Sequence, residues 1–171
     1  MDGTLAAIFF ILGLGDMILN DCPTGCLDSR YGPPTWNFQA ANVLFDERQL
    51  GQEVYLGFDS GQSYGPFAIT YGGSLTDESD MWVGVGAKWT SQRHLESRFF
   101  FEASVMPGLH VRGDGPDLGG ALQFRSAVGA GYRFENGASI TVLYDHRSNA
   151  DLQSVNPGLE TFGIRYAVNL D

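Results

Sequence analysis

The sequence is poor in positive charge. Its 171 residues include a single lysine, Lys88, and nine scattered arginines, none of them before Arg30. Twenty acidic side chains against ten basic ones give a formal net charge of -10. Such a chain repels nucleic-acid backbones, and it has no polybasic run that could anchor it to anionic lipid by charge alone. We therefore expect no nucleic-acid partner.

Cysteine is almost absent as well. Cys22 and Cys26 are the only two, four positions apart in the string DCPTGC, and His94, His110 and His146 lie far away in the sequence. Two thiols without a companion histidine do not make a metal site, so we expect no bound metal. A small disulfide loop in an oxidising compartment and a piece of a removed leader are both open interpretations, and neither carries function.

Long apolar runs are also scarce. The only one, residues 5–19 (LAAIFFILGLGDMIL), is interrupted by Asp16 and is too short and broken for a transmembrane helix. It has the apolar core of a signal peptide, although it lacks the basic start. We expect an atypical signal peptide in residues 1–20 rather than a buried N-terminal helix. Residues 21–35 would then form an N-terminal periplasmic segment, and residues 36–171 the folded domain.

Glycine is abundant, with 23 residues, and aromatic side chains make up 13% of the chain. Glycine and aromatics with few charges suit strands and tight turns. From about Trp36 onward the apolar residues recur with a period of two, which is typical of strands, and no helical period appears. The pattern predicts eight strands, near residues 37–46, 54–58, 67–75, 81–89, 98–109, 122–134, 138–145 and 161–170.

The two faces of these strands differ as in a membrane barrel. Leu122 and Phe124 fall on one face of their strand, and Arg125 and Arg133 fall on the other. A membrane barrel turns its apolar face to lipid and fills a narrow interior with polar and small residues, whereas a soluble barrel does the reverse. Trp89 and tyrosines near strand ends suit interfacial belts. We predict an all-β fold, an eight-stranded antiparallel transmembrane β-barrel, over a soluble lipocalin-like barrel.

The connections between the predicted strands fall into two classes, tight turns and longer loops. Asn136-Gly137 is a tight hairpin signal, whereas residues 112–119 and 149–157 form longer connections. Bacterial barrels keep short turns and both termini in the periplasm, and longer loops at the cell surface. We therefore expect residues 149–157 at the cell surface.

Three polar side chains extend the apolar stripe where the last two strands meet that loop. His146 and Ser148 continue the parity of Val142, and Glu160 starts the stripe that continues with Phe162. Because the two strands are antiparallel neighbours, these side chains can meet on the lipid-facing side. A Ser, a His and a carboxylate are the parts of a nucleophile, its base and the group that orients the base.

Simpler explanations exist for each of the three residues. A Ser two positions from a His is common in loops, and a polar residue at a strand end can simply mark the lipid headgroups. The functional interpretation gains weight because all three share one face at one barrel end. An ionised Glu160 at the edge of the hydrocarbon is also costly without a partner such as His146.

The string His146-Arg-Ser148-Asn149-Ala150, followed fourteen residues after the His by Glu160, resembles the signature of the lipid A 3-O-deacylases. The resemblance continues upstream through LQFRSAVGAGYRFENG and downstream through Asn156 and the last strand. It covers about the last 55 residues specifically, and the rest of the chain only as a strand pattern.

The resemblance implies a serine esterase of the bacterial outer membrane with its active site facing the outer leaflet. Ser148 would be the nucleophile, His146 the general base and later acid, and Glu160 the residue that orients the imidazole. Asn149 and Asn156 match positions associated with the active site, where their amides or nearby backbone N–H groups could stabilise the oxyanion.

The implied reaction is hydrolysis of the 3-O-linked acyl ester of lipid A in lipopolysaccharide, with release of a 3-hydroxy fatty acid. No metal or organic cofactor is expected. The implied partners are lipopolysaccharide and the outer-membrane lipid, and a homodimer is compatible with the pattern. The alternative is a non-catalytic small outer-membrane barrel used for adhesion, binding or anchoring.

Overall fold

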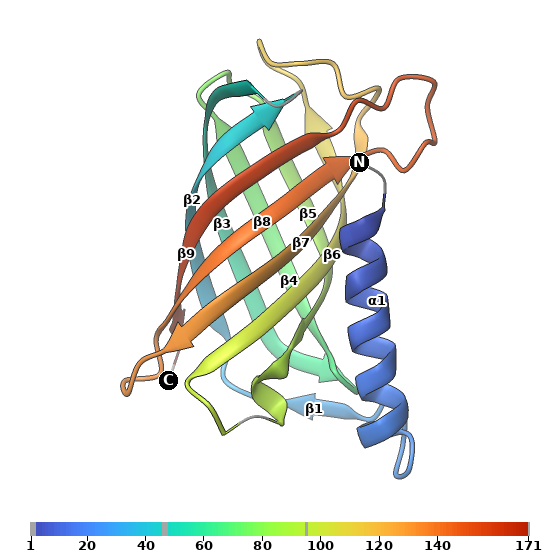
Figure 1. Cartoon of the computed structure of the whole chain (residues 1–171), viewed down its shortest axis with the longest axis vertical. Helices are drawn as coiled ribbons and strands as arrows, with labels where there is room; N and C mark the ends of the chain where they lie inside the picture. The colour runs from blue at the N-terminus through green and yellow to red at the C-terminus, as the bar shows by residue number, and fades with distance from the viewer. Residues whose placement is uncertain (1–2, 46–47, 95, 171) are drawn as a thin grey trace.

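The computed structural model describes residues 3–45, 48–94 and 96–170, and its strands close into an antiparallel barrel (Figure 1). Around the wall the strands follow the order β3, β2, β9, β8, β7, β6, β5 and β4, and β4 pairs back with β3. Their bounds are β2 Thr35–Phe45, β3 Arg48–Tyr64, β4 Phe67–Thr76, β5 Met81–Thr90, β6 Phe99–Val111, β7 Leu122–Arg133, β8 Ser139–Ser148 and β9 Leu159–Asn169. The predicted eight-stranded antiparallel barrel is confirmed.

Several short stretches depart from the predicted strand pattern. β3 is far longer than residues 54–58, because its Gly, Gln and Ser positions carry no alternation and are ordered by pairing with β2 and β4. One end of β3 also pairs with a short strand, β1 (Ser29–Tyr31), inside the segment 21–35. A single 3-10 turn, η2 (Ser91–Arg93), joins β5 to β6, where no helical segment was expected.

The interior of the barrel is filled by paired charges. Arg147 donates to the Glu53 carboxylate at 2.6 Å, and Arg125 lies 2.9 Å from Glu53 and 2.7 Å from Asp145. Thr161 adds a hydroxyl donor to Asp145. A buried charge is tolerated only when it is paired and hydrogen-bonded. The polar interior expected of a membrane barrel is therefore present.

A tryptophan completes this interior. The Trp82 side chain is fully buried, with the guanidinium groups of Arg125 and Arg147 lying 5.7 and 5.6 Å from its ring. A Cβ at Gly84 or Gly108 would come within about 2.5 Å of this ring, so only glycine leaves it room. The alternation of glycine with apolar residues along β5 thus reflects space needed inside the barrel.

We expect Glu53→Ala to destabilise the barrel by about 3–5 kcal/mol, because it leaves Arg147 buried without its carboxylate partner. Urea titration of the barrel in lipid vesicles, followed by the gel shift between folded and heat-unfolded protein, measures this change. Glu135→Ala is the matched control, because it removes an exposed carboxylate from an exposed ion pair with Arg98 and should leave the midpoint unchanged. Equal midpoints for the two variants would contradict a stabilising interior network.

The outer surface of the barrel is apolar. Large side chains such as Phe101, Val142 and Ile164 point away from the interior and are exposed, Phe101 to 61%. A soluble protein rarely exposes so continuous an apolar surface, whereas a membrane barrel presents such a band to lipid. This distribution of side chains contradicts the soluble lipocalin-like alternative.

The N-terminal run forms helix α1 (Thr4–Asp16), followed by the π-helical turn η1 (Met17–Asp21), and it lies outside the wall along β5, β6 and β7 (Figure 1). By length and composition Thr4–Asp21 could cross a membrane. Asp16, which interrupts the apolar run, is buried against the barrel and hydrogen-bonded there.

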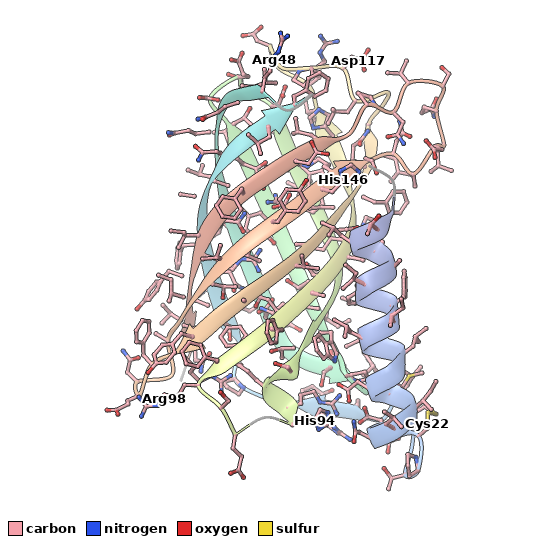
Figure 2. The ribbon with its side chains drawn as sticks, in the orientation of Figure 1. Cys22, Arg48, His94, Arg98, Asp117 and His146 are labelled. Atoms are coloured by element: carbon pink, nitrogen blue, oxygen red, sulfur yellow. A yellow bond between two sulfur atoms is a disulfide. The ribbon has the colours of Figure 1, made fainter. Side chains whose placement is uncertain are left out.

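The helix runs from one end of the barrel to the other. It starts near the end that carries His146 and finishes at the end that carries His94, where Cys22 and Cys26 form a disulfide (Figures 1 and 2). β9 also ends at the His94 side. The two chain ends of the barrel also lie together at this short-turn end, as expected, because Thr35 at the start of β2 pairs with Asn169 at the end of β9.

Trp89 differs from the expected interfacial belt residue. Its ring does point outward, but it is only 8% exposed because Phe9 of α1 covers it. Its indole N–H donates to Asp16 at 2.7 Å. Trp89 therefore joins the helix to the barrel instead of facing the headgroups.

Candidate active site

His146 and Glu160 lie directly opposite each other on β8 and β9. This cross-strand pairing brings the imidazole Nδ1 to 3.2 Å from the Glu160 Oε1. His146 is buried and Glu160 is partly buried, so the pair is shielded from water. Figure 2 shows His146 at the barrel end that also carries Asp117, where the long loops gather. The predicted contact between these two residues is therefore present in the structure.

The Nε2 atom of His146 is buried and has no hydrogen-bond partner among the described residues. When a carboxylate accepts a hydrogen bond from Nδ1–H, it fixes the tautomer that leaves a lone pair on Nε2. The arrangement thus provides a base that is oriented and shielded from water.

Ser148 is the last residue of β8 and shares the outward face with His146. Both residues line a cavity of about 290 Å³ on the outer side of the wall. Within the described ranges no hydrogen bond joins the Ser148 hydroxyl to Nε2. Catalytic hydrogen bonds are often long without substrate and tighten when it binds.

Ser126 is a cavity residue that sequence reasoning missed. It is buried on β7 directly opposite His146 and lines the same cavity as Ser148. The alternation along β7 could have identified it, because position 126 lies on the same face as the outward-facing Phe124 and Val128. A second hydroxyl therefore lies beside the imidazole, and experiments on Ser148 need it as a comparison.

The predicted supporting residues Asn149 and Asn156 lie within the β8–β9 loop. The buried Asn149 amide donates to the backbone oxygens of Leu118 and Val155, at 3.0 and 2.6 Å. Its backbone N–H donates to the Asn156 side chain at 3.0 Å, and the Asn156 amide donates to Asp151 at 2.7 Å. Both side-chain amides therefore hold the loop together, and Asn149 also joins it to the β6–β7 loop.

The hydrogen bonds between Asn149 and Asn156, called here the Asn149–Asn156 clamp, enclose a stretch of strained backbone. Ala150 and Asp151 have φ angles of 55° and 59°, in the left-handed region that non-glycine residues seldom adopt. Ala150 also lines the cavity that contains Ser148. Such conformations persist only when the surroundings enforce them, and they cluster at functional sites. The Asn149–Asn156 clamp is what holds these residues in place.

Gly158 gives the imidazole its space. A Cβ at this position would lie 2.6 Å from the His146 Cε1, and φ is +77°. We expect Gly158→Ala to displace the imidazole and to lower ester hydrolysis by about 100-fold, since misplacement by about 1 Å has that effect. Gly137→Ala is the control, because its φ is also positive (+82°) but it lies in the β7–β8 turn far from the site. Equal activity of the two variants in an ester hydrolysis assay would contradict this role.

A metal site needs several ligating side chains close together. Within the part of the chain that the structure describes, no three His, Cys, Asp or Glu side chains cluster as a metal site would require. The site instead offers an oriented base, two hydroxyls and an apolar cavity, which is the chemistry of acyl transfer.

Comparison with known proteins adds independent information. The family model described as Lipid A 3-O-deacylase (PagL) matches residues 35–169, which span β2 to β9. The lipid A deacylase PagL of Pseudomonas aeruginosa strain PAO1 is 40% identical over 52 residues, which cover 30% of this chain and 30% of that protein.

Solved structures share the fold. The crystal structure of the outer membrane enzyme PagL aligns with a TM-score of 0.62 at 22% identity, covering 78% of this chain and 99% of that one. Neisserial surface protein A aligns with a TM-score of 0.57 at 9% identity, covering 84% and 99%. At these identities the alignments support the architecture of the barrel and nothing finer.

Proposed function

We propose, from the premise that this chain belongs to the lipid A 3-O-deacylase (PagL) family, that it is an outer-membrane serine esterase. Its substrate would be the 3-O-linked acyl ester of lipid A in lipopolysaccharide, and its product a 3-hydroxy fatty acid. The observation that carries the proposal is the shielded His146–Glu160 pair, whose free Nε2 borders the same cavity as Ser148. The family match favours this function over a non-catalytic barrel.

The proposed reaction begins with proton transfer. His146 Nε2 takes the Ser148 hydroxyl proton while the Ser148 oxygen attacks the ester carbonyl carbon. Glu160 accepts a hydrogen bond from Nδ1–H of the resulting imidazolium and stabilises its positive charge, as in other acid–base–nucleophile triads. Because the pair lies in a site of low dielectric, this stabilisation is stronger than in water.

The tetrahedral intermediate then collapses. The bond from the carbonyl carbon to the sugar oxygen breaks, and His146 returns the proton to that oxygen, which leaves as an alcohol. A water molecule, deprotonated by His146, attacks the acyl carbon of the acyl-enzyme. The bond from that carbon to the Ser148 oxygen breaks, His146 returns the proton to Ser148, and the fatty acid is released. We assign Asn149 and Asn156 a positioning role: they hold the loop backbone at Ala150 and Asp151, whose N–H groups would stabilise the developing oxyanion.

The position of the site suits a substrate that stays in the membrane. Ser148 and His146 lie on the outward face of the barrel, next to the long loops, and that end would face the outer leaflet because external loops are the longer ones. The 3-linked acyl chain could then enter the cavity sideways from the lipid. The polar sugar would remain at headgroup level, beside the β8–β9 loop.

Mass spectrometry of lipid A from bacteria that express the chain tests this proposal. We expect the wild-type protein to remove the mass of one 3-hydroxyacyl group and the Ser148→Ala protein to remove none. Heat-modifiable migration on gels should show both proteins as folded barrels in the outer membrane. An unchanged lipid A profile with a folded wild-type barrel would contradict the proposed function.

A further inference from the structure

The cavity beside Ser148 has one wall that does not belong to the barrel. Phe124 and Tyr144 line it on the strand side, and Leu5, Ala6 and Phe10 of helix α1 line it on the other side. Without the helix, this space would be an open groove on the outer face of β6 to β8. The first turns of α1 therefore partly close a groove beside His146 and leave a cavity of about 290 Å³.

The contact between the helix and the barrel is close. Phe9 is 3% exposed and packs with Trp89 and Ala103, and its ring centroid lies 5.5 Å from that of Phe67. One turn further on, a Cβ at Gly13 would overlap the Phe67 ring, so glycine lets the helix approach. Residues spaced by a helical turn thus form one continuous face against side chains of β4, β5 and β6.

Buried polar contacts hold the far end of the helix. The Asp16 carboxylate accepts hydrogen bonds from the Trp89 indole at 2.7 Å and pairs with His94 Nε2 at 2.7 Å. The fully buried Asp21 accepts both terminal nitrogens of Arg93, at 2.8 and 3.1 Å. Figure 2 shows His94 and Cys22 together at this end of the barrel. Removal of the helix would take these acceptors away from Trp89 and Arg93.

The sequence pattern predicts residues 1–20 as a signal peptide; we propose instead that helix α1 stays on the barrel in the working enzyme and forms the outer wall of its acyl-chain subsite. Leu5, Ala6 and Phe10 then set the length of chain that fits beside Ser148. This inference rests on the proposed deacylase function. The cavity, at about 290 Å³, lies just below the usual range for small-molecule sites, about 300–1,000 Å³, so it has room for a single acyl chain and not for a whole glycolipid.

The energetics favour discrimination by chain length. Each methylene buried in an apolar site contributes about fourfold in binding, and overfilling a rigid site reverses this gain. Filling the cavity from the helix side should therefore penalise the longest chains most. The barrel-side chemistry of His146 and Glu160 would be unchanged by such a substitution.

Ala6→Trp tests the proposal against Ile11→Trp, which adds the same side chain at a helix position that is 71% exposed and does not line the cavity. The readout is kcat/KM for lipid A carrying 3-hydroxydecanoyl, 3-hydroxydodecanoyl or 3-hydroxytetradecanoyl chains, with the intact mass of each purified protein. We expect Ala6→Trp to lower the ratio of longest to shortest chain at least about tenfold, as two or more lost methylenes imply. Ile11→Trp should keep the wild-type ratio, and every mass should include α1.

Contrary outcomes separate this inference from the proposed function. If the intact mass lacks α1 in an active enzyme, or if Ala6→Trp discriminates like Ile11→Trp, the helix does not form the subsite although deacylation stands. If the wild-type barrel removes no acyl chain, the function itself is wrong. Ala6→Leu gives a milder version of the same test should the Trp variant not fold, with a smaller shift in the same direction expected.

Discussion

Replacing Ser148 with alanine is expected to lower the rate of ester hydrolysis by about 10⁶-fold, the effect of removing the nucleophile from a serine hydrolase triad. The reason is that His146 then has a free Nε2 but no hydroxyl to deprotonate at the end of β8. The rate is measured with purified barrels in mixed detergent–lipopolysaccharide micelles, by the release of 3-hydroxy fatty acid.

Ser126→Ala is the control that makes this experiment specific. Ser126 lies opposite His146 on the neighbouring strand and lines the same cavity, so the variant removes an equivalent hydroxyl from an equivalent environment. We expect it to retain activity within about tenfold of wild type, because a positioned side chain outside the triad contributes far less than the nucleophile. The reverse pattern, with Ser126→Ala inactive and Ser148→Ala active, would move the nucleophile to β7.

The second large effect is expected from Glu160→Gln. This change keeps the size and position of the side chain but offers an amide to His146 Nδ1, which favours the wrong imidazole tautomer and removes the stabilising charge. The corresponding loss in a serine protease is about 10⁴-fold in kcat, and we expect a loss of that order here. Hydrolysis in the same micelle assay measures it.

Asp114→Asn is the comparison for Glu160→Gln. It neutralises an exposed carboxylate in the β6–β7 loop at the same end of the barrel, and Asp114 does not line the cavity. We expect its activity to equal that of wild type. A similar loss in both variants would mean that the general negative charge of this end matters, and that the specific pairing of Glu160 with His146 does not.

The barrel and the facing pair could be predicted from the sequence because strand parity is a local property. Once alternation fixed the outward side of β8 and β9, the antiparallel register brought His146 and Glu160 face to face, as the structure has them. The same alternation failed for most of β3, where Gly, Gln and Ser give no apolar signal and pairing with neighbours decides the conformation.

Features set by contacts distant in the sequence were out of reach. Helix α1 is apolar on all sides, so no periodic pattern shows which face meets the barrel; the space at Gly13 and the pairing of Asp16 decide it. Likewise, the sequence does not show that the Asn149 side-chain amide donates to loop carbonyls instead of to an oxyanion. The two carbonyls belong to Leu118 and Val155, which come from two different loops.

Reaction of the folded barrel with a long-chain alkyl fluorophosphonate, followed by peptide mass spectrometry, tests most directly whether Ser148 is the nucleophile of a lipid-facing triad. The phosphonate forms a stable adduct only with a hydroxyl activated by a neighbouring base. We predict a single adduct on the peptide containing Ser148, with labelling lost in His146→Ala and retained in Ser126→Ala. An adduct on Ser126, or no adduct in a barrel that still removes acyl chains from lipid A, would contradict the assignment.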